Sequence, residues 1–204
     1  MKRMKCLLIM MLLLMLTACG SKETEGSDVL DEQTAVEKEE AATEEESVSE
    51  DVPSENTEPV KLFGTFTAQT LEGEEVTEEI FAEADLTMVN IWGTFCGPCI
   101  AEMPDLGEIS REYADRGFQI VGMLCDVMEP GDETALQIVD ETKADYTHLV
   151  ASEDLTRNAL QYVSSVPTTV FLDKEGNVVG EIYSGSRDKT TWELLINQCL
   201  AEVK

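Results

Sequence analysis

Apolar runs and helical patterns alternate along residues 61–204, and their order predicts a domain built from both strands and helices. Residues 86–92 form a short apolar run that is typical of a buried strand, and a helical pattern follows from Cys96 to about Arg116. The next apolar run, residues 118–127, predicts a second strand. A strand, a helix and a strand in this order favour a sheet with parallel members and helices on both of its faces.

The rest of this region extends the same pattern in both directions. Alternation over residues 63–70, followed by a turn at 72–74, predicts a hairpin before the first buried strand. A second hairpin is predicted where residues 174–177 join two apolar runs. The other expected elements are strands at 147–151, 168–173 and 178–183 and helices at 133–142, 154–162 and 189–203. The expected fold class is α/β, a central mixed sheet flanked by helices with an N-terminal hairpin extension.

Residues 1–18 have the pattern of a secretory signal peptide. A basic start precedes an apolar stretch over residues 6–16, which is too short to cross a bilayer as a helix of ~20 residues. The letters that follow, LTAC, resemble the lipobox of bacterial lipoproteins, which implies a diacylglyceryl group on Cys19. The alternatives are an uncleaved apolar anchor and a freely secreted product. We expect an extracytoplasmic protein that is anchored to the cell membrane through the lipid on Cys19, of the Gram-positive type.

Residues 19–60 differ from the rest of the chain in composition. They consist mainly of Glu, Ser, Thr and Ala, they contain no aromatic residue, and their acidic residues far outnumber Lys22 and Lys38. So little apolar surface cannot offset the entropy that an ordered chain would lose. We expect a disordered acidic tether between the lipid anchor and a domain over residues 61–204. A helical spacer is the alternative, because Glu and Ala favour helices.

Charge and cysteine content narrow the function classes further. The chain of 204 residues has 14 Lys and Arg against 42 Asp and Glu, a formal net charge of -28, which repels the phosphates of nucleic acids. Nucleic-acid binding is therefore not expected. Two of the six cysteines lie within the first nineteen residues and two form one C-x-x-C pair, so the chain lacks the framework of a small disulfide-rich domain.

The C-x-x-C pair, Cys96 and Cys99, stands where the first long helix is predicted to begin. Unpaired N–H groups and the helix dipole favour a thiolate at the first cysteine, and the second lies one turn further on, within reach of a disulfide. Cys96 is then the attacking thiol and Cys99 the resolving thiol in thiol–disulfide exchange. Pro98 tightens the turn without removing a needed hydrogen-bond donor.

Two other chemistries use cysteine in this way and have to be weighed. The pair could be half of a zinc site. Zinc needs about four ligands, however, and the remaining candidate ligands are only Cys125, Cys199 and the single histidine, His148. A Cys–His hydrolase is the other, and neither Cys96 nor His148 lies in a protease-type signature. We expect no metal site, and no cofactor beyond a redox-active disulfide.

Residues 89–104, VNIWGTFCGPCIAEMP, resemble the signature of the TlpA/ResA-like family of extracytoplasmic thioredoxin-fold thiol–disulfide oxidoreductases. Val166-Pro167 is similar to a second element of that family, a cis-proline that faces the disulfide and leaves the preceding backbone free to pair with an extended substrate. An ordinary trans proline at the start of a strand is the alternative. The resemblance covers about residues 63–204 and implies a thioredoxin-like fold.

The resemblance also implies roles for individual residues. Glu102 occupies the place of a glutamate implicated in proton transfer, although a solvated helix carboxylate is the alternative. Asn90 stands where thioredoxin has a buried aspartate, and an asparagine cannot shuttle protons. The residues expected to bind the substrate are Trp92, Phe95, Gly97, Pro98, Val166 and Pro167. Cys125 and Cys199 are interpreted as packing residues, with a third thiol near the site as the alternative for Cys125.

The resemblance implies an enzyme that acts on protein disulfides and dithiols. The acidic surroundings disfavour a thiolate and point to a reductase. The resemblance further implies that a membrane carrier of the CcdA/DsbD type supplies the electrons and that the protein serves cytochrome c maturation or the repair of exported thiols. Two rival functions remain. A thioredoxin-fold peroxidase of the peroxiredoxin type needs a threonine where Gly93 stands, and a non-catalytic binding lipoprotein would be expected to lose a cysteine or the cis-proline.

Overall fold

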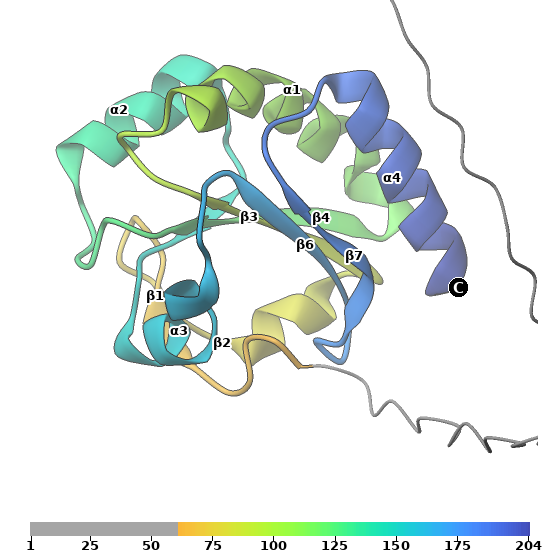
Figure 1. The fold of residues 1–204 in the computed structure, drawn as a ribbon, viewed down its shortest axis with the longest axis horizontal. Coiled ribbons are helices and arrows are strands. Elements are labelled where there is room, and N and C mark those ends of the chain that lie inside the picture. Colours follow the sequence, from red (N-terminus) through yellow and green to blue (C-terminus); the bar gives the residue numbers. More distant parts are fainter. Residues whose placement is uncertain (1–60) are drawn as a thin grey trace, which may run out of the picture. The chain divides into compact units, whose positions relative to one another are not determined.

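A five-stranded mixed sheet with the strand order β5-β4-β3-β6-β7 forms the centre of the fold (Figure 1). The computed structural model describes residues 61–204. The expected signal peptide, the lipidated Cys19 and the tether over residues 19–60 lie outside the described residues. The mixed sheet flanked by helices confirms the α/β fold class that the apolar pattern predicts.

The central strands β3 and β4 are parallel, and the longest helix begins at their carboxyl ends. β3, Leu86–Trp92, is buried at every position, as expected for a strand that is covered on both faces. β4, Phe118–Leu124, pairs with it in parallel register, and β5, Thr147–Leu149, pairs in parallel with β4. β6, Thr168–Asp173, and β7, Val178–Ser184, complete the sheet as an antiparallel hairpin. The carboxyl ends of β3 and β4 therefore lie side by side.

Helices cover both faces of this sheet. On one face lie α1, Gly97–Tyr113, α2, Glu133–Thr142, and α4, Lys189–Glu202 (Figure 1). The other face carries α3, Glu153–Asn158, and a small hairpin of β1, Thr67–Gln69, with β2, Glu75–Thr77. Three short 3-10 helices complete the fold: η1, Glu78–Glu83, η2, Ala114–Arg116, and η3, Leu160–Tyr162. The buried side chains form two separate apolar clusters, one on each face of the sheet.

Several expected boundaries differ from the structure. The predicted helix over residues 154–162 is wrong as one element, because α3 ends at Asn158 and η3 continues only after Ala159 leaves the helical conformation. The strand predicted over 118–127 ends at Leu124. The first hairpin is shorter than the alternating pattern indicates, and the acidic helix η1 that follows it was not expected. These differences fall at element ends, where local patterns carry the least information.

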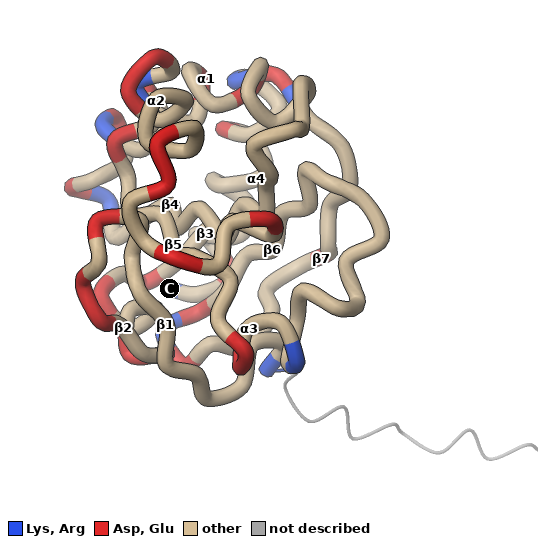
Figure 2. The backbone as a smooth tube through the Cα atoms, turned by 90° about the vertical axis from the view of Figure 1, so that its left-hand side faces the viewer, with Lys and Arg blue, Asp and Glu red and all other residues tan. Residues whose placement is uncertain are grey.

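Charge is distributed unevenly over the surface. Acidic residues lie along the hairpin β1–β2 and around α1 and α2, with basic residues interspersed (Figure 2). The ion pairs formed are mostly between exposed side chains, so each stabilises the fold only slightly. Within residues 61–204, no helix combines the length and the apolar composition that crossing a membrane would require.

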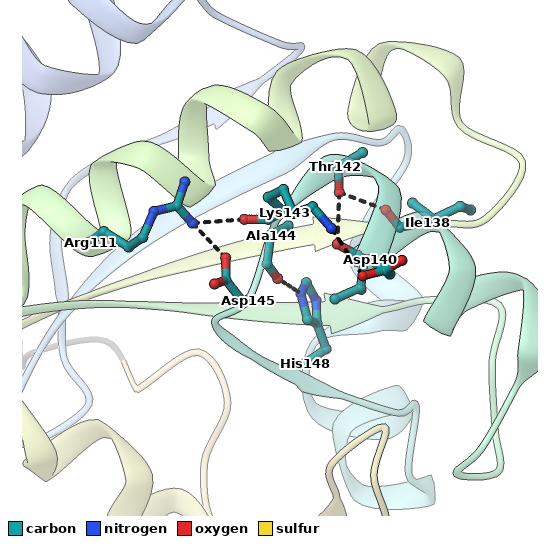
Figure 3. Close-up of polar contacts among 9 residues, drawn as sticks. Arg111, Ile138, Asp140, Thr142, Lys143, Ala144, Asp145 and His148 are labelled. Carbon is teal, nitrogen blue, oxygen red and sulfur yellow. Dashed lines mark hydrogen bonds and ion pairs between the residues drawn. The ribbon is translucent and has the colours of Figure 1, made fainter.

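The only histidine is a buried structural residue. The indole N–H of Trp92 donates to Nδ1 of His148 at 3.2 Å. Nε2 of His148 lies 2.8 Å from the carbonyl oxygen of Ala144 (Figure 3). Gly122 leaves room for this ring, because a Cβ there would come within 2.1 Å of Nδ1. Both ring nitrogens are engaged by these contacts, so His148 is not available to pair with Cys96 as the hydrolase alternative requires.

The connection between α2 and β5 is packed closely against α1. Lys143 ends α2 in the left-handed conformation, and its carbonyl oxygen accepts a hydrogen bond from Arg111 at 2.9 Å (Figure 3). Gly107 allows the approach, because a Cβ at that position would lie 2.2 Å from the same oxygen. Arg111 also pairs with Asp145 beyond the turn. These contacts fix α1 relative to the parallel strands.

We expect acid to destabilise the fold through His148. Burial lowers the pKa of His148 from its usual 6.5 to about 4, so between these values the unfolded chain binds a proton that the folded chain excludes. Stability is therefore full above pH 6.5 and is lost as the pH falls toward 4. The free energy of unfolding, measured by urea titration, should drop by about 2 kcal/mol between pH 7 and pH 5. His148→Gln should lack most of this drop, and an equal drop in the variant would contradict the assignment.

Candidate active site

The two cysteines of the C-x-x-C pair form a disulfide at the beginning of α1. Cys96 is the N-cap residue of the helix, and its sulfur accepts a hydrogen bond from the N–H of Cys99 at 3.2 Å. Cys96 retains 6% exposure, whereas Cys99 is 0% exposed. The first sulfur therefore lies at the helix N-terminus, as the spacing predicts, and Cys96 is the less completely buried of the two cysteines.

An aspartate at the end of the neighbouring strand holds the loop that precedes Cys96. The backbone N–H of Thr94 donates to the carboxylate of Asp126 at 3.0 Å, and the hydroxyl of Thr94 donates to the same carboxylate at 2.6 Å. Phe95 is 71% exposed, and its ring covers Gly93, where a Cβ would come within 2.7 Å of the ring. The loop thus presents an aromatic surface directly beside Cys96.

The predicted cis-proline is present. The Val166–Pro167 peptide bond is cis, and Val166 is half-buried against the apolar cluster that contains Cys96 and Cys99. The carbonyl oxygen of Pro167 accepts a hydrogen bond from the N–H of Gly185 at 2.9 Å. The chain before β6 is therefore attached to the chain that follows β7.

Glu102 is buried one turn after Cys99, so the solvated-carboxylate alternative is wrong. Its side chain is 4% exposed and accepts three hydrogen bonds. Nδ2 of Asn90 donates to Oε1 at 3.1 Å, while the N–H of Arg187 and the indole N–H of Trp192 donate to Oε2 at 3.1 Å and 3.3 Å. Burial raises the pKa of Glu102, and these donors and the charge of Arg187 lower it, with burial the larger effect.

Sequence reasoning missed most of the residues that surround this carboxylate. Asn90 was noted only as the substitute for an aspartate, yet its amide bridges Glu102 and the hydroxyl of Thr169 on β6, at 3.2 Å from the latter. Trp192 and Arg187 lie far along the sequence, and no local pattern connects them with the C-x-x-C pair. An inward-facing polar residue in the fully buried strand β3 was the only available signal.

The expected substrate-binding residues divide into exposed and buried groups. Phe95, Gly97 and Pro98 are exposed around Cys96. Trp92 has 0% exposure and donates a hydrogen bond to the buried His148. A side chain in this position does not fit the expected contact with a substrate. We therefore correct Trp92 from a substrate-binding residue to a packing residue.

Cys125 and Cys199 are the free cysteines of the described residues. Cys125 is half-buried beside Gly93, where a Cβ would lie 3.2 Å from its sulfur, and burial followed by the charge of Asp126 raises its pKa. Cys199 is buried in α4, and burial raises its pKa to about 11. Both groups are thus held as thiols near neutral pH. In the part of the chain that the structure describes, His, Cys, Asp and Glu form no group of three that could hold a metal ion.

Comparisons with known proteins agree with this geometry. Residues 56–193 match the family described as Redoxin. The chain is 30% identical over 128 residues to the thioredoxin-like protein YneN of Bacillus subtilis, covering 63% of this chain and 72% of YneN. It is 33% identical over 96 residues to the thiol-disulfide oxidoreductase ResA of Bacillus cereus, covering 46% of this chain but only 52% of that protein.

Solved structures share the fold at low sequence identity. A thiol:disulfide interchange protein of the thioredoxin family from Chlorobium tepidum superposes with a TM-score of 0.60 at 23% identity, covering 71% of this chain and 99% of that one. StoA from Bacillus subtilis superposes with a TM-score of 0.53 at 16% identity, covering 67% of this chain and 99% of StoA. At these identities the likeness establishes a thioredoxin-like fold.

Proposed function

From its membership of the Redoxin family, as a thiol-disulfide oxidoreductase of the thioredoxin fold, we propose a direction and a location for the reaction of this chain. The protein reduces disulfides of exported proteins while it is anchored to the outer face of the cell membrane. The position of Cys96 carries the proposal. Its sulfur caps α1 and accepts a hydrogen bond from the N–H of Cys99. Cys96 keeps 6% exposure next to the exposed Phe95, whereas Cys99 has none.

The reaction follows from these two positions. In the reduced protein the Cys96 thiolate attacks one sulfur of the client disulfide, forms a Cys96–client disulfide and releases the other client sulfur as a thiolate. The sulfur of Cys99 then attacks the sulfur of Cys96, which breaks the mixed disulfide and releases the second client sulfur. The client gains two electrons and two protons, and the pair Cys96–Cys99 is left oxidised.

Glu102 is the group that we assign to proton transfer in the second step. It follows Cys99 by one helical turn, so both side chains lie on the same face of α1. Its burial raises the pKa of the carboxyl toward the range in which it can exchange a proton near neutral pH. The Cys99 thiol must lose its proton to attack, and Glu102 is the buried carboxylate placed to accept it.

The direction and the location of the reaction rest on the chain as a whole. A net charge of -28 disfavours thiolates, which destabilises the reduced pair and makes it the stronger reductant. The signal-like start and Cys19 support export and lipid anchoring, and two acyl chains would hold the protein stably at a bilayer. A membrane donor of the CcdA/DsbD type would then re-reduce the pair, and cytochrome c maturation is one process it could serve.

One prediction from this mechanism concerns the clients. Cys99→Ser should stop the cycle at the mixed disulfide and accumulate covalent complexes in cells, because the resolving sulfur is missing. These complexes, identified by mass spectrometry after non-reducing electrophoresis, should contain exported proteins with paired cysteines. Cys96→Ser is the matched control and should trap little, since Cys99 is buried. Trapping by Cys96→Ser in place of Cys99→Ser would reverse the assigned roles.

A separate prediction concerns the lipid anchor. Mass spectrometry of the protein isolated from membranes should find Cys19 as the first residue and should find it carrying a diacylglyceryl group. Cys19→Ser should release the protein from the membrane fraction. An unmodified N-terminus at another residue would refute the anchoring proposal and leave the exchange chemistry of Cys96 untouched.

A further inference from the structure

The segment that joins β7 to α4 contacts both functional parts of the site. The N–H of Gly185 donates to the carbonyl oxygen of Pro167 at 2.9 Å, and the N–H of Arg187 donates to Oε2 of Glu102 at 3.1 Å. Residues 185–187 therefore lie between the cis-proline, where a client is expected to bind, and the buried carboxylate. Whatever fixes this short segment also fixes the donor that it offers to Glu102.

The side chain of Arg187 folds back onto its own segment and onto α4. Its Nη1 donates to the carbonyl oxygens of Gly185 at 2.8 Å and Ser184 at 3.4 Å. Its guanidinium group lies 4.9 Å from the centre of the Tyr183 ring and 5.1 Å from the centre of the Trp192 ring. A guanidinium is suited to this arrangement because it is planar, stacks on aromatic rings and has several donors in a fixed geometry.

Both of the Oε2 donors thus depend on the same side chain. Arg187 fixes the segment whose N–H reaches Glu102, and it covers the indole whose Nε1 donates to Glu102 at 3.3 Å. The start of α4 is held separately, because Asp105 accepts from the N–H of Lys189 and the Lys189 ammonium pairs with Glu108 and Glu112. The helix can therefore stay docked on α1 when Arg187 is changed.

We propose that Arg187 is a positioning residue that holds the two donors of Oε2 on the Glu102 carboxylate and so sets the pH range in which Glu102 exchanges its proton. This inference rests on the proposed function, in which Glu102 handles a proton during exchange. Arg187 acts through its backbone and through Trp192, not through contact with the reacting sulfurs.

Few other charged or titratable groups face Glu102. Asn90 of β3 is neutral, and Lys189 of α4 pairs with Glu108 and Glu112. Tyr146 is buried near enough for the charge of Glu102 to contribute, after burial, to its raised pKa. Cys99 lies one turn earlier on α1. Among residues 61–204, Arg187 is the cation whose charge lowers the pKa of Glu102.

The test measures Glu102 directly in the oxidised protein, without a client. The carboxyl carbon of Glu102 is followed by NMR as the pH is changed, with Glu102→Gln used to assign its signal. Arg187→Ala should shift the titration of Glu102 to higher pH, because the carboxylate loses ordered donors and a nearby positive charge. Arg187→Lys keeps the positive charge but lacks the planar guanidinium. The titration of Glu102 in this variant should therefore also lie at higher pH than in the wild type, with a smaller shift than in Arg187→Ala.

Arg116→Ala is the matched control. Arg116 also stacks on an aromatic ring, at 4.0 Å from the centre of Tyr113, and also donates to α4, at Oδ1 of Asn197. It lies at the far end of α1 from the disulfide and should leave the titration of Glu102 unchanged. Thermal unfolding of each variant checks that the fold is retained, and Arg187→Lys alone carries the test if Arg187→Ala does not fold.

A second readout links the residue to the reaction. Arg187→Ala should move the pH profile of disulfide reduction in the direction of its Glu102 titration, and it should leave the profile unchanged when Glu102→Gln is already present. The proposal is overturned if Arg187→Ala titrates like the wild type, if Arg187→Lys restores the wild-type titration, or if the profile still moves in the Glu102→Gln background. Because the NMR titration needs no client, it is independent of whether the protein proves to be a reductase.

Discussion

The burial of one carboxylate beside the disulfide is the constraint on which this site depends. Glu102 is removed from water, and an ionised carboxylate in such a place is tolerated only when donors surround it. Asn90, Trp192 and Arg187 supply those donors from three different parts of the chain. The balance between burial and these hydrogen bonds decides whether the carboxyl carries its proton near neutral pH, and a different arrangement of the same residues would give a different acid.

The strand order and the helix packing bring these parts of the chain together. The parallel pair of β3 and β4 places Asn90 inside the sheet and Cys96 at its edge, and Asp126 holds the intervening loop. The helix α1 then carries the disulfide and Glu102 on successive turns, while the antiparallel hairpin of β6 and β7 returns the chain so that α4 packs beside α1 (Figure 1). The indole N–H of Trp92 donates to the buried ring of His148 on the same side of the sheet, and burial lowers the pKa of this histidine.

Local patterns predicted the elements well and the surroundings of Glu102 poorly. The apolar run of β3, the helical pattern of α2 and the hairpin of β6 and β7 are properties of neighbouring residues, so the sequence was sufficient for them. The cap at Cys96 and the cis bond before Pro167 follow from short motifs and their family resemblance. The hydrogen bonds from Arg187 and Trp192 to Glu102 join residues 85 and 90 positions apart, and they depend on how α4 docks on α1, which no local pattern specifies.

The most direct test of this account is the midpoint potential of the Cys96–Cys99 pair measured against pH in the wild type and in Glu102→Gln. If Glu102 and the thiols share a buried environment, reduction of the pair changes the proton affinity of Glu102, and the two curves must diverge over the range in which the carboxyl titrates. We expect the wild-type curve to change slope in that range and the variant curve to remain straight until the thiols ionise. Two parallel curves at every pH would contradict the account and reduce Glu102 to a structural residue.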